Sequence, residues 1–220
     1  MTNDSDRRPL ASRDTSWARS AARFLASTGI TPNQISMASM VMAALAGGAF
    51  WWAGQAVSGS RPFLLILGAF FCQLRLLCNL FDGMVAIEGG KRSPDGAFWN
   101  EFPDRVADML VFVGVAYGIG DPALGWAAAS FAVFTAYVRE LGRACGLPAD
   151  FSGPMAKQHR MALITAAALL SLLEPLWGGI NQIMAFALWA VAVGGAVTTL
   201  RRGVRMVIAL RSPPPTRGPR

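Results

Sequence analysis

The feature that most constrains this chain is a series of six apolar runs joined by short connections. Each run is long enough to cross a bilayer as an α-helix, which takes about 20 apolar residues. Only 15% of the 220 residues are charged, against roughly a quarter in soluble domains. The pattern predicts an all-α integral membrane protein with six transmembrane helices, at residues 35–56, 62–87, 98–119, 123–144, 161–177 and 180–200.

The basic residues predict how these helices are oriented. Lys and Arg gather before the first run, in the second and fourth connections and after the last run, whereas the other connections hold only Arg61. Cytoplasmic loops are enriched in Lys and Arg, so both termini and connections two and four are predicted to face the cytoplasm. The net charge of +7 therefore reflects topology in the inner membrane rather than binding of nucleic acid. The opposite ends of the runs carry typical membrane-interface anchors: Trp51, Trp52, Trp126 and Trp177.

Polar segments are predicted to flank a membrane domain at residues 35–207. The cytoplasmic N-terminal segment, 1–34, contains an amphipathic pattern with aromatic residues on one face and arginines on another, which suits a helix lying on the membrane surface. A solvated helix is the alternative. Thr31 is predicted to cap the first span, and Gln34 completes a capping box. The Pro- and Arg-rich tail, 208–220, is predicted to be disordered.

Two groups of polar side chains lie near the inner ends of the second and third spans. Asn79 and Asp82 are three residues apart, and Asn100, Asp104 and Asp108 step by four. On helices each group forms a polar stripe, and the short connection predicts antiparallel neighbours whose stripes face each other. A carboxylate inside a span costs about 2.5–3.5 kcal/mol, so these carboxylates need partners.

Two kinds of partner remain open at this point. Hard oxygen ligands from Asp and Asn suit Mg²⁺ or Mn²⁺ rather than zinc, and Mg²⁺ in such sites usually also binds substrate phosphates. Glycines such as Gly83 and Gly96 would let a bulky ligand approach the backbone closely. The alternative is a buried network of ion pairs between the aspartates and two arginines, Arg75 and Arg105.

The stretch from residue 79 to 104 resembles the motif of the CDP-alcohol phosphotransferases, D-x2-D-G-x2-A-R-x8-G-x3-D-x3-D. This chain reads N-x2-D-G-x2-A-I-x8-G-x3-N-x3-D, with the same spacing throughout, and the TPN that often precedes the first span is present at 31–33. The stretch RELGRACGLPADFSGPMAKQHRM also looks like the family's basic region between spans four and five. The resemblance covers most of the predicted membrane domain and implies a six-span membrane enzyme, usually a homodimer.

The resemblance also implies a reaction and its residues. Enzymes of this type move the phosphatidyl group of CDP-diacylglycerol to a small alcohol acceptor in phospholipid biosynthesis and release CMP. Their motif positions bind Mg²⁺ or Mn²⁺, hold the nucleotide and supply a catalytic base. In this chain the metal positions are Asn79, Asp82, Asn100 and Asp104, the nucleotide positions are Gly83, Ala86 and Gly96, and the base is Asp104.

The chain departs from the family pattern at three positions. The motif arginine is Ile87, and Asn79 and Asn100 replace the aspartates that bridge two ions in the family. Two divalent ions carry four positive charges, but Asp82 and Asp104 supply only two negative ones. The chain is therefore predicted to bind one ion tightly, or metal only together with the nucleotide. Candidate auxiliary ligands outside the motif are Asp108 and Glu101.

Basic residues between the fourth and fifth spans are candidates to bind an anionic acceptor such as a phosphorylated polyol: Arg139, Arg143, Lys157 and Arg160. The enrichment of basic residues in cytoplasmic loops also explains their presence. Two other functions compete with the transferase. A non-catalytic relative that binds CDP-lipid or nucleotide and regulates or scaffolds lipid synthesis would fit the loss of two carboxylates. A small transporter fits less well, because the carboxylates cluster at one end of the spans.

Overall fold

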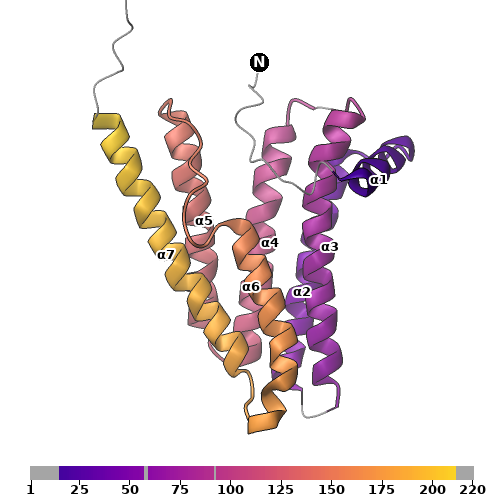
Figure 1. Ribbon diagram of the computed structural model, residues 1–220, viewed down its shortest axis with the longest axis vertical. Helices are drawn as coiled ribbons and strands as arrows, with labels where there is room; N and C mark the ends of the chain where they lie inside the picture. Colours follow the sequence, from indigo (N-terminus) through magenta and orange to yellow (C-terminus); the bar gives the residue numbers. More distant parts are fainter. Residues whose placement is uncertain (1–14, 57–58, 92, 212–220) are drawn as a thin grey trace, which may run out of the picture.

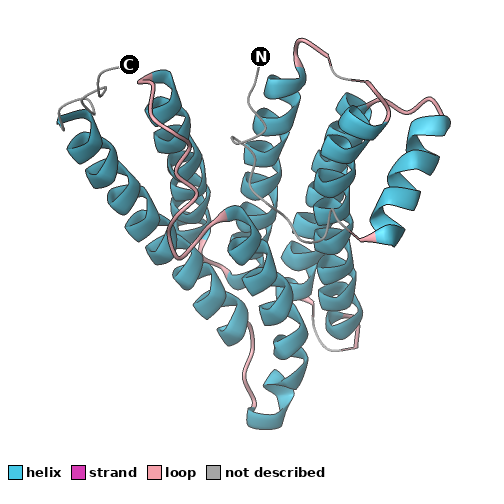
Figure 2. Ribbon diagram, turned by 45° about the horizontal axis from the view of Figure 1, so that its top comes forward, coloured by secondary structure: helices cyan, strands magenta, loops and turns pink. Residues whose placement is uncertain are grey.

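The computed structural model describes residues 15–56, 59–91 and 93–211, and every regular element in these residues is a helix. The predicted all-α class is therefore confirmed for the described part of the chain. In chain order the helices are α1 (Ser16–Ser27), α2 (Pro32–Gln55), α3 (Arg61–Glu88), α4 (Gly96–Ile119), α5 (Pro122–Ala144), α6 (Lys157–Leu170), the 3-10 helix η3 (Ser171–Trp177) and α7 (Gln182–Arg211). Figures 1 and 2 show the long helices side by side, with the α3–α4 and α5–α6 connections at the same end.

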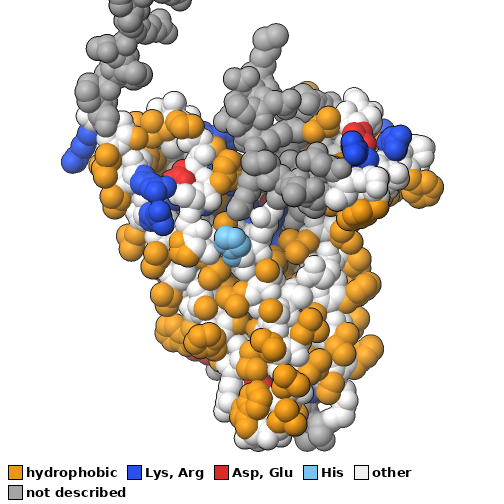
Figure 3. Space-filling view, in the orientation of Figure 1, with side chains coloured by type: hydrophobic (Ala, Val, Ile, Leu, Met, Phe, Trp, Pro, Cys, Tyr) orange, Lys and Arg blue, Asp and Glu red, His pale blue; other side chains and the backbone are white. Residues whose placement is uncertain are grey.

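The six apolar runs coincide with six helical rods, one of which is α6 continued by η3. Four rods are long and apolar enough to cross a membrane: α2, α3, α6 with η3, and α7. The chain is thus an integral membrane protein. Hydrophobic side chains cover most of its flank, while the basic side chains visible on this face lie near the end that carries the two connections (Figure 3).

The last helix is longer than predicted. It was expected to end near residue 200, but α7 continues to Arg211, so the boundary predicted at residue 207 falls inside it. Arg202 explains part of this extension, because its guanidinium donates to the Ser152 and Thr135 carbonyls at 2.9 and 2.7 Å. The tail was predicted to be disordered over 208–220, but residues 208–211 belong to α7. Residues 212–220 lie outside the described residues, as do residues 1–14 of the N-terminal segment.

The predicted N-terminal helix is present as α1 and packs against α3. Ala18 and Ala22 are fully buried in a cluster with residues of α3. Lys91, in the α3–α4 connection, donates to the carbonyls of Ala26 at 2.9 Å and Ile30 at 3.1 Å. These contacts place a cation at the C-terminal end of α1, where the helix dipole favours it.

The start of α2 confirms the predicted capping box. The Thr31 hydroxyl accepts a hydrogen bond from the Gln34 amide at 3.2 Å, and the Gln34 side chain accepts one from the Thr31 amide at 2.9 Å. This cap directs α2 into the bundle beside α3 and α4.

Helix α2 packs extensively on both α3 and α4, which themselves touch only slightly. The expectation that α3 and α4 are directly packed neighbours is therefore wrong, although they are antiparallel. Small residues allow the close approach of α2 to α4: a Cβ added to Gly47 or Gly54 would overlap the α4 backbone, and one added to Gly114 would overlap α2.

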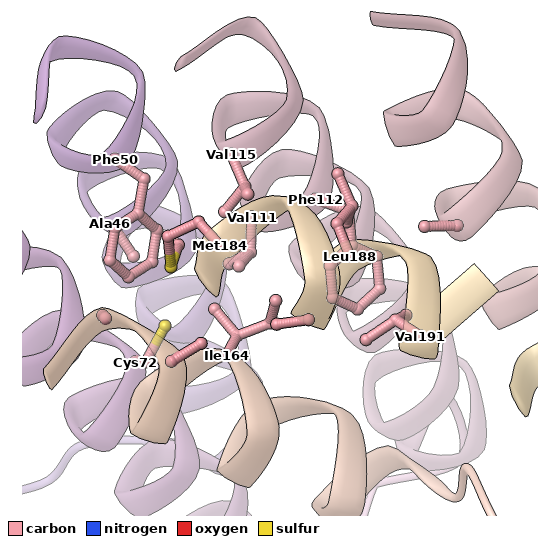
Figure 4. Packing of buried hydrophobic residues seen from close by; sticks show 14 of the residues in the cluster. Ala46, Phe50, Cys72, Val111, Phe112, Val115, Ile164, Met184, Leu188 and Val191 are labelled. Atoms are coloured by element: carbon pink, nitrogen blue, oxygen red, sulfur yellow. The ribbon is translucent and has the colours of Figure 1, made fainter. Parts of the chain in front are cut away.

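Buried side chains of several helices meet in the centre of the bundle (Figure 4). Phe50 of α2, Val111 of α4, Ile164 of α6 and Leu188 of α7 are all buried there. At the end opposite the two connections, the fully buried Glu174 accepts hydrogen bonds from the Arg61 guanidinium at 2.6 Å and from two backbone amides near the start of α7. The apolar centre and this buried ion pair both hold the rods together.

We expect Gly114→Ala to lower the free energy of unfolding by about 1–3 kcal/mol, because the new methyl group would overlap the α2 backbone. Gly48→Ala is the matched control, since a Cβ at Gly48 meets no atom within 4 Å. That change should be neutral, or stabilising by up to about 1 kcal/mol through helix propensity. Thermal unfolding of the purified variants in detergent measures both effects, and equal melting temperatures would contradict the close packing of α2 on α4.

Candidate active site

A cavity of about 770 Å³ opens at the end of the bundle that carries the α3–α4 and α5–α6 connections. Residues from α2, α3, α4, α5 and α6 line it. The site residues predicted from the sequence, with the exception of Asp108, all line this cavity: Asn79, Asp82, Gly83, Ala86, Gly96, Asn100, Glu101, Asp104, Arg139, Arg143, Lys157 and Arg160.

The carboxylate of Asp82 is positioned by α2. Asp82 is 6% exposed, and its Oδ2 accepts a hydrogen bond of 2.8 Å from the Ser36 hydroxyl. Asn79, one turn earlier on α3, lines the same cavity, and its buried side-chain nitrogen has no hydrogen-bond partner. Helical spacing brings Asn79, Asp82, Gly83 and Ala86 to one face of α3. This face presents one carboxylate and one amide to the cavity.

Asp104 meets cations from three helices. Lys157, at the start of α6, forms an ion pair with its Oδ2. Arg105 of α4 lies 3.6 Å from Oδ2, and Arg75 of α3 lies 3.8 Å from Oδ1. Asp104 Oδ1 is buried and has no hydrogen-bond partner. The carboxylate therefore has cations beside both oxygens, and its Oδ1 has no hydrogen bond.

Asp108 occupies a different environment one turn further along α4. It is fully buried, and its two oxygens accept hydrogen bonds from Arg75 at 2.6 Å and from Arg160 at 2.5 Å. Arg160 also donates to the Met155 carbonyl at 3.0 Å. Both arginines are themselves almost completely buried. Asp108, Arg75 and Arg160, called the buried triad below, are thus a structural unit beneath the cavity.

Arg139 of α5 lines the cavity between two glutamates. Its Nη2 donates to Glu101 at 2.5 Å and its Nε donates to Glu140 at 2.9 Å. The guanidinium also lies over the Phe151 ring, 5.4 Å from the ring centroid. Arg143 donates to Glu140 at 3.3 Å, so the same glutamate serves two arginines.

The rim of the cavity is ordered by Asp95, at the start of α4. Its Oδ2 accepts hydrogen bonds from the Trp99 indole at 2.8 Å and from the Asn33 side chain at 3.3 Å. Hydrogen bonds from Ser93 and Trp99 hold the pKa of the exposed Asp95 carboxyl below its usual value. Asp95 thus connects the start of α2 to the start of α4.

Sequence reasoning named Arg75 and Arg105 as partners of the aspartates but missed several contributors. Ser36 gave a weak signal only, in that it follows the TPN stretch by three residues. Nothing local marks the pairing of Arg160 with Asp108, because 52 residues separate them. The expected network of ion pairs exists around Asp104 and Asp108, whereas Asp82 accepts its hydrogen bond from the Ser36 hydroxyl of α2.

The oxygen atoms that line the cavity provide only part of the coordination shell of a hard divalent cation. In the described residues no group of three or more His, Cys, Asp or Glu side chains is arranged to hold a metal ion. Asn79 and Asp82 of α3 and Asn100 and Asp104 of α4 do line the cavity, and Asp104 Oδ1 and the Asn79 side-chain nitrogen have no hydrogen bond. Oxygen donors of this kind suit Mg²⁺ or Mn²⁺, and ligand oxygens from a substrate would have to complete the coordination.

We expect Asp108→Asn to cost about 3–5 kcal/mol of stability, because it leaves Arg75 and Arg160 buried without a negative charge. Glu88→Gln is the control, since Glu88 is exposed and does not line the cavity. Its effect should stay within about 0.5 kcal/mol. Thermal unfolding in detergent is the measurement, and a variant as stable as the wild type would contradict the structural role of the buried triad.

Comparison with known proteins gives several matches. No protein-family model matches the chain. A phosphatidylinositol phosphate synthase of Streptomyces avermitilis is 29% identical over 197 residues, which cover 83% of this chain and 75% of the relative. An archaetidylinositol phosphate synthase of Aeropyrum pernix is 30% identical over 155 residues, covering 70% of this chain and 75% of the relative.

Among solved structures, the phosphatidylinositol phosphate synthase of Mycobacterium tuberculosis with CDP-DAG bound superposes with a TM-score of 0.72. The match covers 94% of this chain and 99% of the other, at 19% sequence identity. The same enzyme has been solved with manganese and citrate. These superpositions show that the two chains share a fold.

Proposed function

The chain belongs to the CDP-alcohol phosphotransferase family, and from this premise we propose that it transfers a phosphatidyl group from CDP-diacylglycerol to an alcohol acceptor, with release of CMP. The observation that carries the proposal is the convergence of the family-spaced positions on one cavity: Asn79, Asp82, Gly83, Ala86, Gly96, Asn100 and Asp104. The chain keeps the spacing of the family motif although asparagine stands at two of its four aspartate positions.

The substrates would occupy the cavity as follows. The nucleotide lies against Gly83, Ala86 and Gly96, where the absence of large side chains permits close approach to the backbone. The diphosphate lies near Asp82 and Asp104, and the acyl chains extend into lipid. The acceptor enters from the side lined by α5 and α6. A volume of about 770 Å³ is within the range of cavities that enclose a nucleotide-sized group.

In the proposed reaction Asp104 is the general base. Its carboxylate accepts the proton of the acceptor hydroxyl, whose oxygen then bonds to the β-phosphorus that bears diacylglycerol. The bond between this phosphorus and the bridging oxygen breaks, and CMP leaves with that oxygen. Lys157 and Arg105 form ion pairs with Asp104 and position its carboxylate in the cavity. Positioning of the two substrates and neutralisation of charge supply most of the acceleration.

We propose that Asn79, Asp82, Asn100 and Asp104 hold a divalent cation, Mg²⁺ or Mn²⁺, together with phosphate oxygens of the nucleotide. When bound, this ion polarises the phosphoryl oxygens and stabilises the leaving group. The M. tuberculosis enzyme with manganese supports the choice of metal. Two carboxylates suit one ion better than two. Glu101 and Asp108 contribute less directly to this site, since each already pairs with arginines.

We also propose six transmembrane spans, with α4 and α5 crossing the bilayer beside the four more apolar rods, and with both termini and the active site facing the cytoplasm. The tryptophans at the opposite end support this orientation, because Trp51, Trp52, Trp126 and Trp177 are all about half exposed or more, as interface anchors are. In this arrangement the exposed Phe24 of α1 lies in the inner membrane surface. By analogy with the family, a homodimer is expected.

A second candidate function is a non-catalytic protein that binds CDP-lipid or nucleotide. The observation in its favour is the ion pair between Lys157 and Asp104, which engages the proposed base, together with the two asparagines at ligand positions. Metal-dependent binding of CDP-diacylglycerol without CMP release, whatever the acceptor, would support this candidate over the transferase.

We expect Asp104→Asn to reduce metal-dependent CMP release by about 10²–10⁴-fold, because an amide cannot accept the acceptor proton. The assay uses the purified protein in lipid with CDP-diacylglycerol, Mn²⁺ or Mg²⁺ and a mixture of alcohols, with EDTA as the metal-free control. Glu88→Gln should keep wild-type turnover. Full turnover by Asp104→Asn, with its helical content unchanged, would refute the assignment of the base.

Restoring the family carboxylates should strengthen metal binding. We expect the double change Asn79→Asp with Asn100→Asp to lower the Kd for Mn²⁺ by at least about tenfold, because affinity for hard cations rises with the number of ligand charges. Electron paramagnetic resonance of free Mn²⁺ measures the Kd without any turnover. Gln182→Glu adds a carboxylate at the other end of the bundle and controls for net charge. An unchanged Kd in the double variant would place the metal elsewhere.

A further inference from the structure

Building on the proposed transferase function, we infer that the acceptor is an alcohol without a phosphate group, because Glu101 and Glu140 neutralise the arginines that a phosphate would need. The names of the relatives describe phosphorylated products. The sequence alone suggested a similar, anionic acceptor for this chain. The ion pairs of the cavity point to an uncharged polyol instead.

Arg139 lines the cavity, and the edge of its guanidinium formed by Nε and Nη2 is occupied by two glutamates. A guanidinium binds a phosphate with a fork of two parallel N–H groups. Here Nη2 donates to Glu101 at 2.5 Å and Nε donates to Glu140 at 2.9 Å, while one face of the group lies over Phe151. A phosphate could reach this fork only by displacing two carboxylates.

The other basic side chains that line the cavity are engaged as well. Arg105 pairs with Glu101 at 3.5 Å, and Arg143 pairs with Glu140 at 3.3 Å. The remaining four also donate to protein oxygens, either to aspartates or to backbone carbonyls: Lys91, Lys157, Arg160 and Arg202. Within the described residues, each cation of the lining therefore already has an acceptor in the protein.

Glu101 and Glu140 would repel a phosphomonoester, although the lining as a whole carries more basic than acidic side chains. Such a group carries about −1.5 to −2 charge near pH 7. It would approach two glutamates whose side chains are 33% and 39% exposed to the cavity mouth. Metal binding at Asp104 would free Lys157 from its ion pair, but a single ammonium group does not replace an arginine fork.

The same glutamates suit the hydroxyl groups of a polyol. A carboxylate offers several acceptor positions and takes hydrogen bonds from alcohols without losing its ion pair to an arginine. Glu101 is also one turn before Arg105 and three residues before Asp104 on α4, so an alcohol bound to Glu101 is close to the proposed base. We therefore assign Glu101 and Glu140 as specificity-determining residues.

The test compares acceptors in matched pairs: inositol with inositol phosphate, and glycerol with glycerol 3-phosphate. The purified wild-type protein is assayed in lipid with CDP-diacylglycerol and Mn²⁺, and CMP is measured. For the polyol that the protein uses, we expect kcat/KM to be at least about tenfold higher for the unphosphorylated form, because Glu101 and Glu140 repel the phosphate of the other form. A preference for the phosphorylated member would overturn this inference and leave the transferase function intact.

The double variant Glu101→Gln with Glu140→Gln tests whether these two glutamates cause the preference for an unphosphorylated acceptor. Its preference should shift toward the phosphorylated acceptor by about tenfold or more, because the arginine fork is released. Glu88→Gln removes one exposed carboxylate at the same end of the bundle and should leave the preference unchanged. An unchanged preference in the double variant would overturn the inference.

Calorimetric titration with inositol phosphate in the presence of Mn²⁺ measures acceptor binding without turnover. It therefore tests the acceptor inference even if the proposed transferase function fails. If no alcohol supports CMP release, the transferase function fails. Tight binding of inositol phosphate to the wild type would then also overturn the inference. Binding by the double variant but not by the wild type would support neutralisation by the two glutamates.

Discussion

The ion pairs that Asp108 forms with two buried guanidiniums organise the middle of the bundle. Arg75 comes from α3 and Arg160 from α6, and the three side chains are almost entirely removed from solvent. An unpaired charge at this depth would be costly, so the three helices are held in one register. In that register Lys157, three residues before Arg160, reaches Asp104, one turn before Asp108. The charged wall of the cavity thus depends on the buried triad beneath it.

Helix α2 determines the space above that triad. Its glycines let it approach the α4 backbone closely between Leu110 and Gly118 while it also packs on α3. The polar stripes of α3 and α4 both line the cavity. Ser36 of α2 completes the wall by donating to Asp82. A fold built from apolar helices in this way keeps a polar chamber at one end without exposing charge to lipid.

The chain shares its fold with the M. tuberculosis synthase at 19% identity, but a few side chains set the electrostatics of its cavity. Asparagines at two ligand positions reduce the negative charge available to a metal. Glutamates beside Arg139 reduce the positive charge available to an acceptor. The two features act in opposite directions on the charge of the lining, because the asparagines leave it more positive and the glutamates make it less positive. Function at this level is decided by individual charges and not by the arrangement of helices.

Local features of the chain were predictable from the sequence. Apolar runs of bilayer length predicted the six rods, and Thr31 with Gln34 predicted the start of α2, because helix formation and capping depend on residues within a turn or two. The spacing of Asn79 with Asp82, and of Asn100 with Asp104, predicted shared faces for the same reason. The length of α7 was underestimated, since the partners of Arg202 lie on other segments.

The tertiary structure alone decided which charges meet. The sequence offers 20 basic residues, and nothing near Asp108 or Arg139 along the chain selects Arg160 or Glu101 as its partner. The tertiary structure also decided that α3 and α4 each pack against α2 and have little direct contact with each other. Backbone geometry sets the direction of a side chain within its own helix, but its partner depends on how all the helices pack and on the requirement that each buried charge be neutralised.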